Sequence, residues 1–150
     1  MHIAYTTAGT LIPGIHTMTL ADFKNQFGMA TRQRQYLFEK LERGLNNLRK
    51  AGVKVVYLDG SFVTRKAHPG DIDGCWDASP EIDLTILDSV FLDFEQRHLM
   101  KEKYGVDFFI SQTIEGASGK PFTDFFQTDR NGVEKGIVRL LLEHESFEGS

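Results

Sequence analysis

The run VKVVYL at residues 53–58 is the most strand-like stretch of the chain, and it constrains the fold more than any other feature. It is rich in β-branched residues and lies between two glycines, Gly52 and Gly60. Four leucines before it recur at helical spacing: Leu37, Leu41, Leu45 and Leu48. We therefore expect a helix over residues 31–51 that ends at Gly52 and packs against a sheet containing this strand.

Two further strands are predicted downstream. The segment 71–76 forms the first, and the run VDFFIS at residues 106–111 forms the second. Between them, Ser79 and Pro80 introduce a segment with apolar residues at helical spacing, so we expect a helix that ends near Tyr104. The apolar residues of this segment are Leu87, Val90, Phe91 and Phe94. All three predicted strands are expected to be neighbours in one sheet.

The two ends of the chain carry weaker signals. Residues 1–30 are expected to form an ordered or semi-ordered arm and a short helix, LADFKNQF, capped by Thr19. Near the other end, DRNG at residues 129–132 predicts a turn, and GIVRLLL after it fits either a strand or a helix. The pattern predicts one α+β (mixed α/β) domain over residues 1–150, with a motif-bearing core at 31–110 and a twisted mixed sheet on which helices pack.

Composition and charge narrow the class of protein. With 150 residues, 41% of them hydrophobic, the chain is long enough for one domain with its own core. A net charge of −4 argues against broad, nonspecific nucleic-acid binding but leaves a local basic pocket open. The single cysteine, Cys75, cannot form an internal disulfide, and zinc is disfavoured. Because the sequence has no long apolar span, we expect a cytoplasmic protein without a membrane segment.

The stretch DGSFVTRKAHPGDID, residues 59–73, combines a Gly-Ser pair, basic residues and two closely spaced aspartates. Asp71 and Asp73 are two residues apart on a predicted strand, so their carboxylates share one face and can bind a hard cation such as Mg²⁺ or Mn²⁺. Gly60 and Ser61 follow a strand, where exposed amides and a hydroxyl can hold phosphate oxygens. A further hydroxyl and two positive charges come from Thr64, Arg65 and Lys66.

A third carboxylate is available from Asp107 within VDFFIS. Its neighbours Val106 and Phe108 are expected to face the core, which leaves Asp107 on the opposite face of the strand. From there it can approach Asp71 and Asp73 on an adjacent strand. An ionised residue inside an apolar strand is otherwise costly to bury, which favours a functional role.

Each of these features has a simpler interpretation. GDIDG alone is also typical of a solvated turn, Asp107 of a solvent-facing strand residue, and the basic pair of a polar loop. Asp83 competes with Asp107 as the third carboxylate, although a first-turn acid of a helix gives the same pattern. Phe125 and Phe126 are interpreted as core residues rather than as a platform for a base. Lys135 fits a solvated strand better than a contact to a triphosphate.

The order of the motif residues resembles the nucleotidyltransferase fold shared by DNA polymerase β, poly(A) polymerases, antibiotic nucleotidyltransferases and the minimal nucleotidyltransferases of toxin–antitoxin pairs. The pattern here is Gly60-Ser61, nine residues, Asp71-Ile72-Asp73, and later Asp107 on a strand. LDGSFVTRKAHPGDID and YGVDFFIS look like an uncharacterised family of small bacterial and phage-borne nucleotidyltransferase-like proteins. This resemblance covers residues 31–110. The chain departs from it in GCWD, where Gly74 is expected to weaken the strand.

The resemblance implies metal-dependent transfer of an NMP group from an NTP to a hydroxyl. Asp71, Asp73 and Asp107 would hold Mg²⁺ or Mn²⁺, Asp107 would activate the acceptor, and Gly60 with Ser61 would hold the phosphates. It leaves open whether the acceptor is a protein, an RNA or a small molecule, and whether the chain forms a homodimer. The alternative is a catalytically inactive nucleotide- or partner-binding module, such as an antitoxin that binds a toxin.

Overall fold

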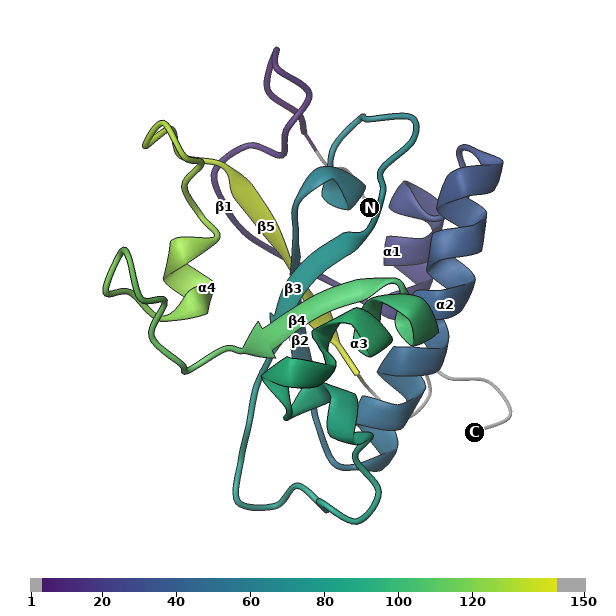
Figure 1. The fold of residues 1–150 in the computed structure, drawn as a ribbon. Coiled ribbons are helices and arrows are strands. Elements are labelled where there is room, and N and C mark those ends of the chain that lie inside the picture. The colour runs from purple at the N-terminus through teal and green to yellow at the C-terminus, as the bar shows by residue number, and fades with distance from the viewer. Residues whose placement is uncertain (1–3, 143–150) are drawn as a thin grey trace.

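A computed structural model of the protein describes residues 4–142 and contains one mixed sheet of five strands (Figure 1). The strands are β1 (Gly14–Met18), β2 (Val55–Asp59), β3 (Ile72–Trp76), β4 (Val106–Ile110) and β5 (Gly136–Leu141). They lie in the order β1-β5-β2-β3-β4, and β2 is antiparallel to both of its neighbours. The other two pairs, β1 with β5 and β3 with β4, are parallel. The fold is therefore α+β, and the three predicted strands are neighbours.

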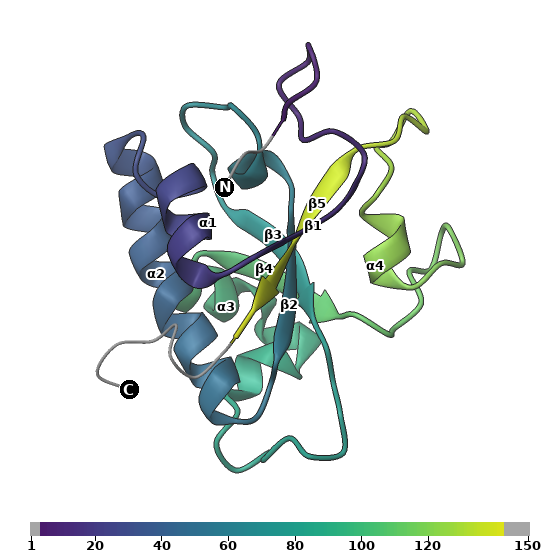
Figure 2. The same cartoon turned by 180° about the vertical axis from the view of Figure 1, so that it is seen from behind.

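Helices cover the two faces of the sheet unequally (Figures 1 and 2). The α-helices are α1 (Leu20–Phe27), α2 (Arg32–Lys50), α3 (Arg97–Tyr104) and α4 (Phe122–Phe125), and the 3₁₀ turns are η1 (Ser61–Val63), η2 (Ser89–Phe91) and η3 (Phe94–Gln96). Helices α1 to α3 lie on one side of the sheet and α4 lies on the other. The main core, with Leu58 and Trp76, is on the side of α1 to α3, and a smaller cluster around Phe122 and Ile137 lies beside α4.

Two predicted helices are confirmed, the first together with its predicted Thr19 cap. The Thr19 hydroxyl accepts the amide of Asp22 at 3.2 Å at the start of α1. The Thr31 hydroxyl accepts the amide of Arg34 at 3.1 Å at the start of α2. The buried residues of α2 include the four leucines of the sequence pattern, Leu37, Leu41, Leu45 and Leu48. The apolar spacing therefore located both the helix and its buried face.

The helix predicted to run from Ser79 to Tyr104 is wrong over most of its length. Only Arg97–Tyr104 is α-helical, as α3, and residues 79–96 form turns and the 3₁₀ segments η2 and η3. Three aspartates explain the difference, because each side chain accepts the amide two residues further along the chain. These are Asp83, Asp88 and Asp93. Such local bonds compete with the hydrogen bonds of a continuous helix.

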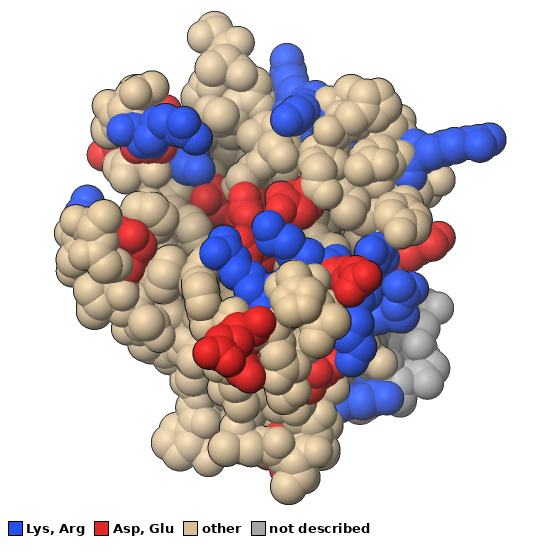
Figure 3. All heavy atoms as spheres, viewed as in Figure 1, with Lys and Arg blue, Asp and Glu red and all other residues tan. Residues whose placement is uncertain are grey.

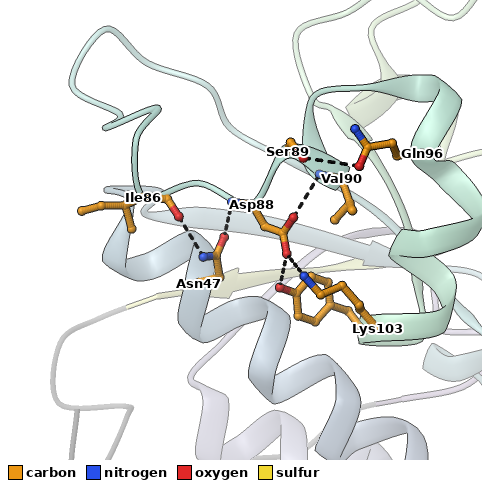
Figure 4. Close-up of polar contacts among 8 residues, drawn as sticks. Asn47, Ile86, Asp88, Ser89, Val90, Gln96 and Lys103 are labelled. Atoms are coloured by element: carbon orange, nitrogen blue, oxygen red, sulfur yellow. Dashed lines mark hydrogen bonds and ion pairs between the residues drawn. The ribbon is translucent and has the colours of Figure 1, made fainter.

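Asn47 and Asp88 fix this segment against α2 and α3 (Figure 4). The Asn47 side-chain amide donates to the carbonyl of Ile86 at 3.0 Å, and its oxygen accepts the amide of Asp88 at 2.8 Å. The Asp88 carboxylate accepts the Tyr104 hydroxyl at 2.5 Å and forms an ion pair with Lys103. Side-chain contacts with two helices therefore order the segment in place of a helix of its own.

The N-terminal arm contains a strand that the sequence pattern did not predict. β1 pairs in parallel with β5 along its whole length. β5 also settles the open choice for GIVRLLL in favour of a strand. The DRNG turn is confirmed, since the amide of Gly132 donates to the carbonyl of Asp129 at 3.0 Å. The expectations for residues 1–3 and 143–150 lie outside the described residues.

Gly74 does not weaken β3, because the sheet requires a glycine at this position. A Cβ on Gly74 would lie 2.3 Å from the carbonyl oxygen of Tyr57 and 2.9 Å from the ring of Phe108. The missing side chain therefore allows β2 and Phe108 to pack directly against β3. The intact strand fixes the register of Asp73, which pairs with Asp107 on β4.

Gly74→Ala is expected to destabilise the protein by about 3 kcal/mol, because an added methyl group forces β2 or the Phe108 ring to move. Gly116→Ala is the matched control, since no atom lies within 4 Å of a Cβ at that position. Urea unfolding followed by the fluorescence of Trp76 measures both variants. Equal free energies of unfolding for the two variants would contradict this account of β3.

Candidate functional site

The turn after β2 lies directly against a carboxylate of β3. Gly60 has a φ of 77°, in the left-handed region that favours glycine, and Ser61 begins η1. A Cβ on Gly60 would lie 2.4 Å from Asp73 Oδ2. Both the backbone conformation and the neighbouring carboxylate therefore require glycine here. The structure thus brings the predicted Gly60-Ser61 pair beside Asp73.

A buried arginine holds the loop that follows this turn. Arg34 is only 3% exposed, and its guanidinium donates to backbone carbonyls of the loop and of the end of α1. The accepting carbonyls belong to Phe27, Ser61, Phe62, Thr64 and Lys66. Burial lowers the pKa of this guanidinium. Sequence reasoning missed Arg34, and the available signal was its position on the apolar face of the helix, three residues before Leu37.

Three strands place aspartates side by side at one end of the sheet. Asp59 at the end of β2 lies opposite Asp73, and Asp73 lies beside Asp107 on β4. Directly paired residues of neighbouring strands point to the same face, so the three carboxylates form a row, and Asp71 extends it from two residues before Asp73. We call Asp59, Asp71, Asp73 and Asp107 the carboxylate row. It lies on the α4 side of the sheet, because residues of the same alternation set, such as Phe109, pack in the cluster beside α4.

Asp59 is the member of the carboxylate row that sequence reasoning missed. It is only 5% exposed, and the Lys135 ammonium lies 2.9 Å from it although 76 residues separate the two in the chain. Burial raises the pKa of Asp59, and the ion pair with Lys135 opposes that shift. The sequence could have pointed to Asp59, because it ends an otherwise apolar strand, where an unpaired charge is costly.

Two basic residues of α3 neutralise the other end of the carboxylate row. Arg97 Nε donates to Asp107 Oδ1 at 2.7 Å, and its terminal nitrogen binds the second oxygen. Lys101 lies between two carboxylates, 3.5 Å from Asp71 and 4.0 Å from Asp107. Asp71 and Asp107 therefore meet around one ammonium group. Figure 3 shows acidic side chains gathered near the centre of this face with basic ones immediately beside them.

Asp73 is the carboxylate that these cations leave unpaired. Within residues 4–142 it forms no ion pair. Burial, followed by the negative charges of Asp71, Asp59 and Asp107, raises the pKa of Asp73 to about 6. The carboxylate row thus has four acids and three basic partners, and a further cation at Asp73 would relieve the remaining repulsion.

The carboxylate row suits a hard divalent cation, which prefers oxygen ligands. The crowding that raises the pKa of Asp73 is the observation that favours a cation here. In the described part of the chain, however, no three Asp, Glu, His or Cys side chains converge as a metal-binding group. Lys101 occupies the space between Asp71 and Asp107. The residues therefore fit a divalent cation in chemistry and charge, provided that Lys101 moves away.

A cavity of about 490 Å³ opens beside the turn. Gly60, Ser61 and Thr64 line it, and so do Asp59 and Lys135. This volume lies in the range of roughly 300–1,000 Å³ that is usual for small-molecule sites. Three of the five residues predicted to bind nucleotide thus share one cavity with the partly buried ion pair of Asp59 and Lys135.

The two remaining predicted nucleotide-binding residues do not line this cavity. Arg65 places its guanidinium over the ring of Tyr5, 4.8 Å from the centroid, and Lys66 is exposed. Asp83, the competing third carboxylate, is exposed, and hydrogen bonds within its own turn lower its pKa. The strand register therefore favours Asp107 over Asp83 as the partner of Asp73.

The comparisons with known proteins give a family but no activity. A family model described as a family of unknown function (DUF6932) matches residues 3–141, and the chain belongs to that family. No curated protein and no solved structure matches the chain. None of the helices between residues 4 and 142 is long and apolar enough to cross a membrane.

The metal-free protein is expected to lose stability as the pH rises through the titration of Asp73. The Asp73 carboxyl has a pKa of about 3.9 in an unfolded chain and of about 6 in the folded protein. The folded state therefore binds the extra proton between these pH values, and this contribution is lost as the pH passes about 6. Asp73→Asn should stabilise the protein by about 2 kcal/mol at pH 7 and hardly at all at pH 4.

Urea unfolding in the presence of a chelator, at pH 4 and pH 7, measures this difference. Asp124→Asn is the control, because it removes a carboxylate from an exposed position outside the row. A stability difference between wild type and Asp73→Asn that is the same at both pH values would contradict the crowding of the carboxylate row.

Proposed function

We propose that the protein is a metal-dependent nucleotidyltransferase that moves an NMP group from an NTP to a hydroxyl acceptor. One observation carries the proposal: any side chain on Gly60 would run into the Asp73 carboxylate, and Asp73 has Asp107 beside it on the next strand. The turn is suited to bind phosphate oxygens, and the carboxylates beside it are suited to bind a cation. The resemblance of the motif residues to nucleotidyltransferases supports the same assignment.

In this proposal the turn after β2 holds the triphosphate. Gly60 lets phosphate oxygens approach the backbone, and the Ser61 hydroxyl donates to them. The Thr64 hydroxyl already donates to the Ser61 carbonyl at 2.7 Å, so its role is to shape the turn. Arg34 fixes the same loop from below through its carbonyls. The loop is therefore organised before a ligand arrives, which lowers the cost of binding.

The acceptor hydroxyl attacks the α-phosphorus, diphosphate leaves, and the released proton passes to Asp107. Arg97 orients Asp107 through two hydrogen bonds. Asp71 and Asp73 would hold Mg²⁺ or Mn²⁺, which supplies positive charge opposite the triphosphate when bound. Lys101 must leave Asp71 for this to happen, and the triphosphate offers its ammonium a new partner.

A binding module without turnover is the second candidate, and a specific observation favours it. Arg97 and Lys101 already neutralise Asp107 and Asp71, so most of the carboxylate row has its counter-charges without a metal. Such a protein would bind a nucleotide or a protein partner, for example a toxin, and carry out no chemistry.

Wild-type protein incubated with each α-labelled NTP, Mg²⁺ or Mn²⁺, and candidate acceptors is expected to yield covalent label. Co-purified protein and total RNA are the acceptors to test. Asp71→Asn/Asp73→Asn should reduce the labelling at least about 100-fold, because it removes the charge that holds the cation and leaves side-chain size unchanged. Asp22→Asn/Asp124→Asn removes the same charge outside the carboxylate row and should label like wild type.

Absence of label with every NTP and acceptor would refute the transferase proposal. If the wild type then binds an NTP or a protein partner as tightly as Asp71→Asn/Asp73→Asn does, the binding module is the better account. Equal labelling by wild type and this variant would show that the chemistry takes place elsewhere.

A further inference from the structure

A second cleft shares Asp59, Asp129 and Lys135 with the cavity beside the Gly60 turn. It has a volume of about 810 Å³, and its wall is formed by the α4 region, the DRNG turn and the end of β2. Residues that line it include Lys120, Phe125, Phe126 and Arg130, together with Asp59 and Lys135. We call it the basic cleft. In Figure 3 basic side chains gather over the loop that follows α4 on this face of the molecule.

The charges that line the two cavities differ in sign. The basic cleft has three cationic side chains, Lys120, Arg130 and Lys135, against the two carboxylates of Asp59 and Asp129. The cavity beside Gly60 has only Lys135 against Asp59, Asp129 and Glu134. A phosphate group therefore needs a metal ion in the first cavity but not in the basic cleft. This local positive charge contrasts with the net charge of −4 of the whole chain.

Both acidic side chains of the basic cleft already form an ion pair or hydrogen bonds within the protein. Asp59 is paired with Lys135 at 2.9 Å. The Asp129 carboxylate accepts the amides of Asn131 at 2.8 Å and Val133 at 3.0 Å. The side chains of Lys120 and Arg130, by contrast, form no ion pair among the described residues and are exposed. Two positive charges are therefore available to an anion that enters the cleft.

The basic cleft also has an aromatic wall. Phe126 is buried in the cluster beside α4, as the sequence predicted, but Phe125 is only partly buried. Their ring centroids lie 5.7 Å apart with an interplanar angle of 50°. The accessible part of Phe125 is a surface on which a base can stack, and base stacking on aromatic side chains is a general mode of nucleotide recognition.

We propose that the basic cleft binds a nucleoside phosphate, either a free nucleotide or the terminal nucleotide of an RNA, and presents it as the acceptor. Lys120 and Arg130 contact its phosphate, and Phe125 contacts its base. Asp59 and Lys135 line both cavities, so a ligand in the cleft adjoins the carboxylate row. The acceptor role rests on the proposed function, whereas the binding of a nucleoside phosphate does not.

The test is calorimetric titration of wild-type protein with AMP and with a four-nucleotide RNA, in EDTA and at two salt concentrations. Lys120→Ala/Arg130→Ala should weaken the binding of both ligands at least about tenfold and make it less dependent on salt, because the variant removes the charges that contact the phosphate. Arg43→Ala/Lys50→Ala is the matched control, since it removes one arginine and one lysine from exposed positions of α2. Amide shifts of Phe125 and Gly132 in NMR spectra should report the same binding.

Tighter binding of the RNA than of AMP would identify an RNA terminus as the ligand, and tighter binding of AMP than of the RNA would identify a free nucleotide. The proposal is overturned if neither ligand binds the wild type at millimolar concentration, or if both double variants weaken binding equally. Because EDTA excludes metal and the titration needs no turnover, this result is independent of the labelling experiment. Label transfer can fail while the cleft binds, and the cleft can fail while label transfer succeeds.

Discussion

Repulsion between carboxylates at one end of β2, β3 and β4 is the constraint on which the site depends. The strand register fixes Asp59, Asp73 and Asp107 in a row, so these charges cannot separate without breaking the sheet. The chain offsets the repulsion with basic side chains from distant segments, Lys135 before β5 and Arg97 in α3. These ion pairs join the segment before β5 to β2 and join α3 to β4, and they leave Asp73 unpaired among the described residues, beside the turn that follows β2.

Whether the proposed site would catalyse a reaction or only bind a ligand depends on whether the basic side chains can leave the carboxylates for another partner. Lys101 lies between Asp71 and Asp107, in the place that a cation shared by these carboxylates would take. A triphosphate that attracts Lys101 would open that place, whereas a permanent ion pair would leave an inert site. Lys135 lines two cavities, of which the first has more acidic than basic side chains and the basic cleft more basic than acidic ones. The two proposals therefore differ in one requirement: a phosphate ligand would need a metal ion in the first cavity and none in the basic cleft.

The local part of this arrangement could be predicted from the sequence, because it follows from short-range patterns. Period-two alternation places Asp71 and Asp73 on one face, and a glycine after a strand predicts the turn. The pairing of Asp59 with Lys135 could not be predicted, since it depends on β5 lying beside β2. β1 was missed for the same reason, as it is short and its partner is at the far end of the chain. The helix over 79–96 was predicted wrongly because the prediction used only the spacing of apolar residues. That spacing carries no information about aspartate side chains that accept hydrogen bonds from backbone amides.

The most direct test of the central claim is the titration of the Asp73 carboxyl carbon by NMR, first in chelator and then in Mg²⁺. The account predicts a midpoint near pH 6 without metal, raised by burial and by the neighbouring carboxylates, and a clear fall when Mg²⁺ binds the carboxylate row. A midpoint of about 4 without metal, the value of an ordinary aspartate, would contradict the crowding of the row. A midpoint near 6 that Mg²⁺ leaves unchanged would contradict its role as a cation site.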